Sequence, residues 1–512
     1  MKKILSLVLA IMMIVALGAV SLPAMADEEP VLLTYYTENS SGEQEYTQQV
    51  ADKLSELLQA KGINVKIELH PYASGGSYKT GFTLAQTSGQ QIDLFTTYNI
   101  DFTTEVENGS VMPLDDLLAA HPETVAEVPE WLVKMGRVNG TQYYIPTYQQ
   151  ATNGRYFLAP NAYLEAANLS IEDVRKVMNH GTTAEKLDML EKYCRDVRTA
   201  TGKDTKWISM PPFYAMSWVE YIDSNYGDLI LREGAEGPEY WPLTDDAKTM
   251  FEYAAKWYKD GLIHPDVMTY NGSDFRDKNF LNDEALIVDW PESTSSEEMV
   301  INSRAWTQEV PSSCCMVFDH WYIGSKWAAG GNAIFATCEH PDEAMEVIRM
   351  LMTKEGEEIY NTLVWGLEGI HYEWVDRSIP RIKTLEYDSS QAGAGTSTYD
   401  CRKWMVGNTF NCWLNQAMAD DNYCQWLLDN VHNAESTVTS KVMGYTWNLM
   451  DTEDERAACK AVRDEYNASL SNGIYGDEWE AKYEEYIAKL NASGLQAILD
   501  SVTEQYNSYV GK

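Results

Sequence analysis

The first 193 residues of the chain contain no cysteine, and the eight cysteines that follow form no Cys-x-x-Cys pair. Structural zinc sites are built from such pairs, so we expect no zinc centre and interpret the thiols as buried and free. Disulfides are the alternative because the count is even, and Cys412 with Cys424 is the pair to test first. The hydrolase motifs His-Glu-x-x-His and Gly-x-Ser-x-Gly are absent too, which removes two common enzyme classes.

Basic residues are scarce: 39 Lys and Arg stand against 77 Asp and Glu, a formal charge of −38. Such a surface repels nucleic acid and anionic lipid, so we expect no nucleic-acid partner and a neutral or cationic ligand. Hydrophobic residues make up 45% and aromatic residues 12% of the chain, which indicates a packed protein rather than an acidic disordered one. The 512 residues suggest two large domains.

Only one segment, residues 4–20, is a long apolar run. Lys2 and Lys3 precede it and the small-residue pattern Ala-Met-Ala at 24–26 follows, which predicts a signal peptide of residues 1–26 cleaved after Ala26. The remaining chain carries 37 basic and 77 acidic residues, a charge of −40. An uncleaved membrane anchor is the alternative. We expect an exported protein at the cell surface, outside the cell or in the periplasm.

Strand-like and helix-like segments alternate at the start of the mature chain, which predicts a parallel α/β sheet. Ligands of such sheets lie beyond the carboxyl ends of the strands. Those ends carry Tyr36 and Glu38 in one case and Tyr98 and Asn99 in another. The predicted strands are 31–36, 65–69 and 92–98, and the predicted helices are 43–59 and 77–87.

Further elements extend the α/β pattern, and a charged helical region ends the chain. Two strand-like runs within 318–337 flank Gly330-Gly331, a possible return crossing between domains. The other predicted elements are helices 185–201, 245–260 and 341–353, a strand at 284–290, and final helices at 453–471, 478–490 and 495–509. The expected division is lobe 1 at 27–150, lobe 2 at 151–320, a return to lobe 1 at 321–395, and a mostly helical region at 396–512 packed on lobe 2.

Residues 365–372, Trp-Gly-Leu-Glu-Gly-Ile-His-Tyr, place indole, carboxylate, imidazole and phenol around two glycines. Glu368 and His371 have the spacing of half a helical metal site. The glycines disfavour a helix and no partner motif is visible, so we expect no metal site and no cofactor. Hydrogen bonds to a ligand, or to the backbone of the loop itself, are the better interpretation.

This loop and several other segments together resemble extracellular solute-binding proteins of ABC oligosaccharide importers, a family 1-like group related to bacterial oligosaccharide-binding lipoproteins. The resemblance covers most of the mature chain unevenly and includes the C-terminal helical region. One departure is that the lipid-anchoring cysteine typical of the family just after the leader is missing. The segments that carry the resemblance are Trp-Gly-Leu-Glu-Gly-Ile-His-Tyr at 365–372, Asn-Gly-Ser-Val-Met-Pro-Leu-Asp-Asp-Leu-Leu at 108–118, Val-Asn-Gly-Thr-Gln-Tyr-Tyr-Ile-Pro at 138–146, Lys-Trp-Tyr-Lys-Asp-Gly-Leu-Ile-His-Pro-Asp at 256–266, and residues 462–473 and 489–494.

The resemblance implies a two-lobed α/β fold of the type II periplasmic-binding-protein kind, with a hinge between the lobes and no catalytic residues. It also implies an oligosaccharide ligand, ABC permease subunits as partners, hinge closure as the mechanism, and a monomer. Two alternatives remain: an exported carbohydrate-active enzyme, which needs a pair of carboxylates across the sugar, and a sugar-sensing partner of a membrane kinase.

Sugar binding requires flat rings against the apolar face of a pyranose and fixed polar groups for its hydroxyls. For every aromatic candidate the alternative is core packing, and for Arg155 it is a structural salt bridge. The candidates for stacking are Tyr36, Tyr98, Tyr148, Trp290, Trp321 and Trp365, and those for hydrogen bonding are Glu38, Asn99, Arg155, Glu368 and His371.

Overall fold

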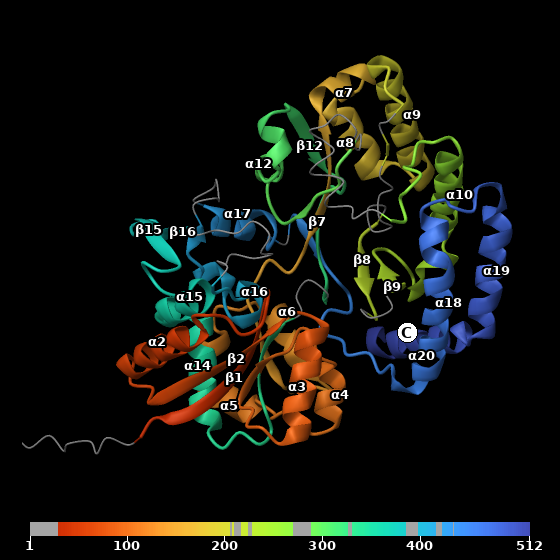
Figure 1. Ribbon diagram of the computed structural model, residues 1–512. Coiled ribbons are helices and arrows are strands. Elements are labelled where there is room, and N and C mark those ends of the chain that lie inside the picture. The colour runs from red at the N-terminus through yellow and green to blue at the C-terminus, as the bar shows by residue number, and fades with distance from the viewer. Residues whose placement is uncertain are drawn as a thin grey trace, which may run out of the picture.

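Two lobes make up the molecule (Figure 1), and the chain passes between them more than once. This computed structural model describes residues 29–511 except 205–206, 209–216, 224–227, 270–287, 326–329, 386–397, 416–421 and 434. The predicted signal peptide 1–26, its cleavage after Ala26 and most of the predicted strand 284–290 lie outside the described residues. Among the helices that the structure does describe, none has the length and apolar character needed to cross a membrane.

A five-stranded sheet with the order β2-β1-β3-β14-β6 forms the centre of lobe 1. β1 pairs in parallel with β2 and β3, whereas β14 runs antiparallel to β3 and β6. The carboxyl ends of β1, β3 and β6 therefore meet the start of β14 at one edge of the sheet, as predicted for the first two. The strands are β1 (Val31–Asn39), β2 (Val65–Ala73), β3 (Leu94–Thr96), β6 (Tyr144–Pro146) and β14 (Gly331–Ile334).

Amphipathic helices cover this sheet and bury its apolar residues. Val50, Leu54 and Leu58 of α2 pack in the same core as Leu33 and Ile67 of the strands, because their spacing places them on one helix face. The helices of lobe 1 are α2 (Thr47–Ala60), α3 (Gly76–Ser88), α4 (Phe102–Glu107), α5 (Asp115–Ala120), α6 (Glu130–Val133), α14 (Pro341–Met352), α15 (Glu357–Trp365) and α16 (Lys403–Val406). Its smaller strands are β4 (Arg137–Val138), β5 (Thr141–Gln142), β15 (Tyr372–Asp376), β16 (Arg381–Thr384) and β17 (Leu414–Asn415).

Lobe 2 contains two small sheets with the orders β11-β7-β12 and β10-β9-β8. Capping boxes start two of its helices, with Ser170 and Thr182 as the N-cap residues. The strands are β7 (Gly154–Pro160), β8 (Val219–Tyr221), β9 (Leu229–Arg232), β10 (Glu239–Tyr240), β11 (Glu292–Ser293) and β12 (Ser312–Met316). The helices are α7 (Asn161–Ala166), α8 (Ile171–His180), α9 (Thr183–Thr201), α10 (Asp245–Lys259) and α12 (Glu297–Asn302).

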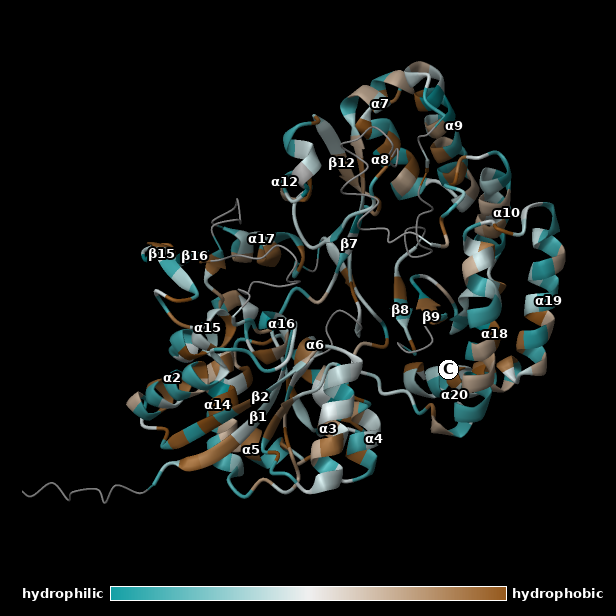
Figure 2. Ribbon diagram, viewed as in Figure 1, coloured by the Kyte–Doolittle hydropathy of each residue, from teal (hydrophilic) through white to brown (hydrophobic). Residues whose placement is uncertain are grey.

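Three C-terminal helices, α18 (Glu453–Ser471), α19 (Trp479–Ala492) and α20 (Leu495–Val510), pack against lobe 2. Tyr466 and Tyr486 share a core with Trp257 of α10, and the two tyrosine rings stack 5.5 Å apart. The three predicted helices are confirmed to within two residues at each end. Figure 2 shows brown apolar stretches on the strands β1 and β9 and teal polar stretches on the helix α19, as expected when helices cover a core of buried strands.

Three segments connect the lobes: 147–153 leads from β6 to β7, 324–330 leads from β13 (Trp321–Ile323) to β14, and 431–449 leads to α18. The third contains β18 (Thr437–Thr439), which pairs in parallel with β13. It follows α17 (Tyr423–Asn430). The sequence-based division places residues 399–413 in the C-terminal region on lobe 2, whereas Tyr399, Met405 and Trp413 pack in the core of lobe 1. All eight cysteines are free thiols, and six of them are buried.

A buried carboxylate, Glu220 of β8, holds two of these connections together. The backbone N–H of Ser325 donates to both of its oxygens at 3.0 Å, and the Ser440 side chain, just after β18, also bonds to it. Burial raises the pKa of Glu220 to about 7. Because the pKa in the folded protein lies above that of the unfolded chain, Glu220 stabilises the protein below about pH 4.5 and loses this contribution as the pH rises through 7.

We therefore expect Glu220→Gln to raise the free energy of unfolding at pH 8 by about 1–3 kcal/mol and to leave it unchanged near pH 4.5, because the amide removes the cost of ionising a buried acid. Urea unfolding at both pH values measures the difference. Glu435→Gln changes an exposed carboxylate beside the same connection and serves as the control. An equal effect of Glu220→Gln at both pH values would contradict the expectation.

Candidate functional site

The edge of the lobe 1 sheet gathers polar groups from several strand ends. Glu38 lies on β1 and Asn99 lies three residues after β3. The Asn99 side-chain amide donates a short hydrogen bond to Oε2 of Glu38, and the backbone N–H of Gly75 donates to the same oxygen at 3.4 Å. The structure thus brings together two residues predicted from separate strands.

The side chain of Glu38 is completely buried, and the hydrogen bonds from Asn99 and Gly75 both go to Oε2. Oε1 is buried and has no hydrogen-bond partner among the described residues. Burial raises the pKa of Glu38, while Asn99 and Gly75 lower it through their hydrogen bonds. A buried carboxylate oxygen without a donor is costly, so this atom marks a place where a ligand donor would be favourable.

A distant segment of the chain completes this edge. The backbone N–H of Arg402 donates to the carbonyl of Glu38 at 3.3 Å, and its Nε donates to Ser74 Oγ at 3.3 Å. Trp404 meets Tyr98 edge-on with ring centroids 4.6 Å apart, and both side chains are partly exposed. Sequence reasoning missed Arg402, Trp404 and Ser74, since no local motif marks them. We call Glu38, Ser74, Tyr98, Asn99, Arg402 and Trp404 the sheet-edge cluster.

Tyr148 lies on the first connection, residues 147–153, and packs against two residues from the C-terminal part of the chain. Its ring contacts Phe410 at 4.3 Å and stacks with His432 at 5.6 Å, and its hydroxyl lies 3.4 Å from Nδ1 of His432. Nε2 of His432 lies 3.1 Å from the carbonyl of Gln150. Burial lowers the pKa of His432. These contacts tie the first connection to the third, so in this conformation Tyr148 supports the hinge region.

Arg155, Trp290 and Trp321 lie away from the sheet-edge cluster, in and beside lobe 2. The buried Arg155 side chain forms an ion pair with the exposed Glu292, and its Nη1 donates to the carbonyl of Trp290 at 2.7 Å. Trp321 packs so closely on Gly154 that a Cβ there would lie 2.8 Å from the indole. The salt-bridge alternative for Arg155 therefore describes what the structure shows, and both tryptophans belong to packed clusters.

The loop at 365–372 closes on itself. His371 is fully buried, and its Nδ1 accepts a hydrogen bond from the backbone N–H of Leu367 at 2.9 Å. Burial lowers the pKa of His371 to about 4, so the ring is neutral. Gly366 has φ +81°, and a Cβ there would lie 2.5 Å from His371 Nδ1. The imidazole therefore holds the turn, which matches the alternative of bonding to the loop's own backbone.

The remaining candidates also lie apart from the cluster. Trp365 ends α15 and is buried in the lobe 1 core. Glu368 is exposed and pairs with Arg377 at 2.5 Å. Tyr36 is buried beneath α3, and stacks with His70 at 4.7 Å; burial raises its pKa to about 12. Among the described residues, none of these three side chains forms a hydrogen bond, an ion pair or a ring contact with the sheet-edge cluster.

The fold and this edge are those of a two-lobed solute-binding protein. Residues 53–367 match the family described as bacterial extracellular solute-binding protein, and the chain belongs to that family, whose members are exported. Residues 441–511, the three-helix region, match a domain of unknown function called DUF3502. No curated protein matches the chain.

Solved structures with the same fold cover nearly the whole chain. An N-glycan transport solute binding protein from Streptococcus pneumoniae is 15% identical with a TM-score of 0.72, over 94% of this chain and 99% of that one. An extracellular solute-binding protein from Bifidobacterium longum subsp. infantis is 14% identical with a TM-score of 0.60, over 95% and 99%. An HMO-binding protein associated with an ABC transporter from Bifidobacterium longum infantis is 13% identical with a TM-score of 0.61, over 94% and 99%. The predicted two-lobed α/β fold is confirmed.

Proposed function

We propose that this protein is the extracellular substrate-binding subunit of an ABC importer and captures a neutral oligosaccharide between its lobes. The observation that carries the proposal is the buried Oε1 of Glu38, at the edge where the sheet strands end, which has no hydrogen-bond partner in the part of the chain that the structure describes. That edge is where open α/β sheets bind ligands. Relatives of the same fold support the ligand class, since one was solved with Man1GlcNAc bound and another is described as HMO-binding.

The sheet-edge cluster has the two kinds of group that a sugar requires. Tyr98 and Trp404 offer partly exposed aromatic rings for the apolar face of a pyranose. Glu38 and Asn99 offer an acceptor and an amide for its hydroxyls. The excess of 77 acidic over 39 basic residues favours a neutral ligand over an anionic one. Tyr148, Trp290 and Trp321 are packed against neighbouring side chains in this conformation and are candidates only for a conformation in which the lobes have moved.

The mechanism follows from the connections between the lobes. Ligand bound at the sheet-edge cluster would contact lobe 2 on closure, and the closed form would dock on the permease subunits. We propose a monomeric protein with no covalent step, since its family and its relatives are binding proteins. Export, which the family implies, would place it at the cell surface, outside the cell or in the periplasm.

The proposal is tested with the mature chain and a panel of neutral oligosaccharides, uronate oligosaccharides and short peptides. We expect at least one neutral oligosaccharide to raise the melting temperature and to bind at one per chain in calorimetry, with no product in chromatography. Binding of peptides alone would overturn the carbohydrate assignment. Release of shortened sugars would instead support the carbohydrate-active enzyme.

A further inference from the structure

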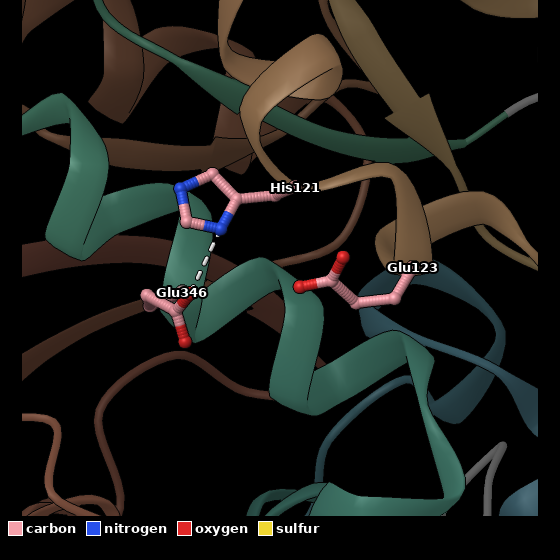
Figure 3. A group of neighbouring side chains, drawn as sticks. All are labelled: His121, Glu123 and Glu346. Carbon is pink, nitrogen blue, oxygen red and sulfur yellow. Dashed lines mark ion pairs between the residues drawn. The ribbon is translucent and has the colours of Figure 1, made fainter.

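A histidine and two glutamates gather on lobe 1, outside the sheet-edge cluster (Figure 3). His121 and Glu123 lie at the start of the short 3-10 helix Pro122–Val125, and Glu346 lies in the middle of α14. One ligand atom from each of the three side chains lies within 4.8 Å of the other two. Nδ1 of His121 is 2.8 Å from Oε1 of Glu346.

We propose that His121, Glu123 and Glu346 form a binding site for a divalent transition metal ion, with Zn²⁺ as the preferred ion. Tetrahedral zinc holds its nitrogen and oxygen ligands at about 2.0–2.2 Å, which puts the ligand atoms roughly 3.3–3.5 Å apart. To reach that spacing, the His121–Glu346 contact must open slightly and the exposed Glu123 side chain must rotate. Water takes the fourth position on the exposed side. From the sequence we expected no metal site, and this proposal departs from that expectation.

Further charged groups lie beside two of the three ligands. Nε2 of His121 lies 3.9 Å from Oδ1 of Asp342, beyond hydrogen-bond distance but on the side where a carboxylate can support a metal-bound imidazole through its second nitrogen. Nη2 of Arg349 lies 2.8 Å from Oε2 of Glu346, which leaves Oε1 of that glutamate turned toward His121. Ligands held in this way lose little freedom when an ion binds.

The chemistry of the donor set selects the ion. One imidazole nitrogen with two carboxylates suits Zn²⁺ and its neighbours, whereas Mg²⁺ and Ca²⁺ take oxygen ligands. Arg349 pairs with Glu346 at 2.8 Å, with Glu355 at 2.7 Å and with Glu123 at 3.7 Å, so one cation is set against these three carboxylates and that of Asp342. The local charge is therefore negative and favours a cation. A bound ion would link the 3-10 helix to α14 and so stiffen the outer side of lobe 1.

Calorimetry with Zn²⁺ on the mature chain, treated with a chelator and carrying no histidine tag, tests the proposal. We expect one ion per chain with a dissociation constant in the micromolar range or below, and a rise in melting temperature on adding Zn²⁺. Co²⁺ in place of Zn²⁺ should give the absorption of a four-coordinate site. Ca²⁺ and Mg²⁺ should give neither effect at equal concentration.

Three substitutions separate this site from adventitious binding. Glu123→Gln alters an exposed side chain whose carboxylate lies 3.7 Å from Nε of Arg349, and should weaken binding at least tenfold; His121→Ala should abolish it. His340→Ala is the matched control, because His340 faces Glu343 at 4.0 Å near the start of the same helix without a third ligand. The proposal fails if the unaltered chain does not bind Zn²⁺, or if binding survives His121→Ala and is lost in His340→Ala. Since the readout is metal binding, failure here leaves the carbohydrate proposal intact.

Discussion

Replacing Glu38 with alanine is expected to weaken oligosaccharide binding by about 10- to 150-fold, because a hydrogen bond to a charged group contributes about 1.5–3 kcal/mol. Glu38 is fully buried, and its Oε1 has no partner among the described residues. Glu38→Gln should have a smaller effect of up to about tenfold. If the amide oxygen still accepts from Asn99, an amide NH₂ group takes the place of Oε1 and presents a donor where the ligand needs an acceptor. Calorimetric titration of both variants gives the ratios.

The matched control is Glu368→Ala, which removes the other carboxylate predicted as a ligand contact. Glu368 is exposed and pairs with Arg377, so its loss should leave affinity within about twofold of the unaltered chain. Melting of the ligand-free variants shows whether Glu38 substitutions act on binding or on folding. Weaker binding in Glu368→Ala with no change in Glu38→Ala would move the ligand site to the 365–372 loop.

Gly473→Ala is expected to lower the free energy of unfolding by about 3 kcal/mol or more. The left-handed backbone conformation is unfavourable for alanine, and the added Cβ would also overlap a neighbouring helix. Gly473 follows α18 with φ +72°, and a Cβ there would lie 2.0 Å from the carbonyl oxygen of Ala254 in α10. The C-terminal helices could remain in place only if that contact opened. Urea unfolding followed by tryptophan fluorescence reports the change, because Trp257 lies in the same core.

Gly476 provides the comparison for this substitution. It also has a positive φ, +50°, but nothing lies within 4 Å of its Cβ position. Gly476→Ala should therefore cost only the backbone term of about 1–2 kcal/mol. If the two variants lose equal stability, contact with α10 is not what limits position 473.

Local patterns were enough to predict most of the helices and the sheet edge. The helices at 453–471 and 495–509 follow from apolar spacing and from glycines at their ends, both of which are local in the chain. Glu38 and Asn99 were placed together because the ends of parallel strands share one edge. The helices thus follow from signals within each segment, whereas the pairing of Glu38 with Asn99, 61 residues apart, follows from a general rule of parallel sheets.

Residues brought in from a distance could not be predicted in this way. Arg402 contacts Glu38 across 364 residues of sequence and Trp404 contacts Tyr98 across 306, and no spacing within 400–404 indicates either contact. The 365–372 loop presents the opposite case. Its indole and imidazole suit a ligand site and a protein core equally well. The structure shows the core arrangement, because His371 is buried and its ring packs edge-on against Tyr46 with centroids 4.9 Å apart.

Strand β14 has a consequence for the order of assembly. It lies between β3 and β6 in the sheet, yet it is made only after lobe 2 has interrupted the chain for about 180 residues. Until residues 331–334 emerge, β3 and β6 have no shared neighbour, and the core residues from 399–413 are missing as well. Pairings between such distant segments form slowly. A chain that must cross a membrane before it folds gains from this delay, because lobe 1 cannot complete its sheet and core until residues 331–334 and 399–413 have been threaded.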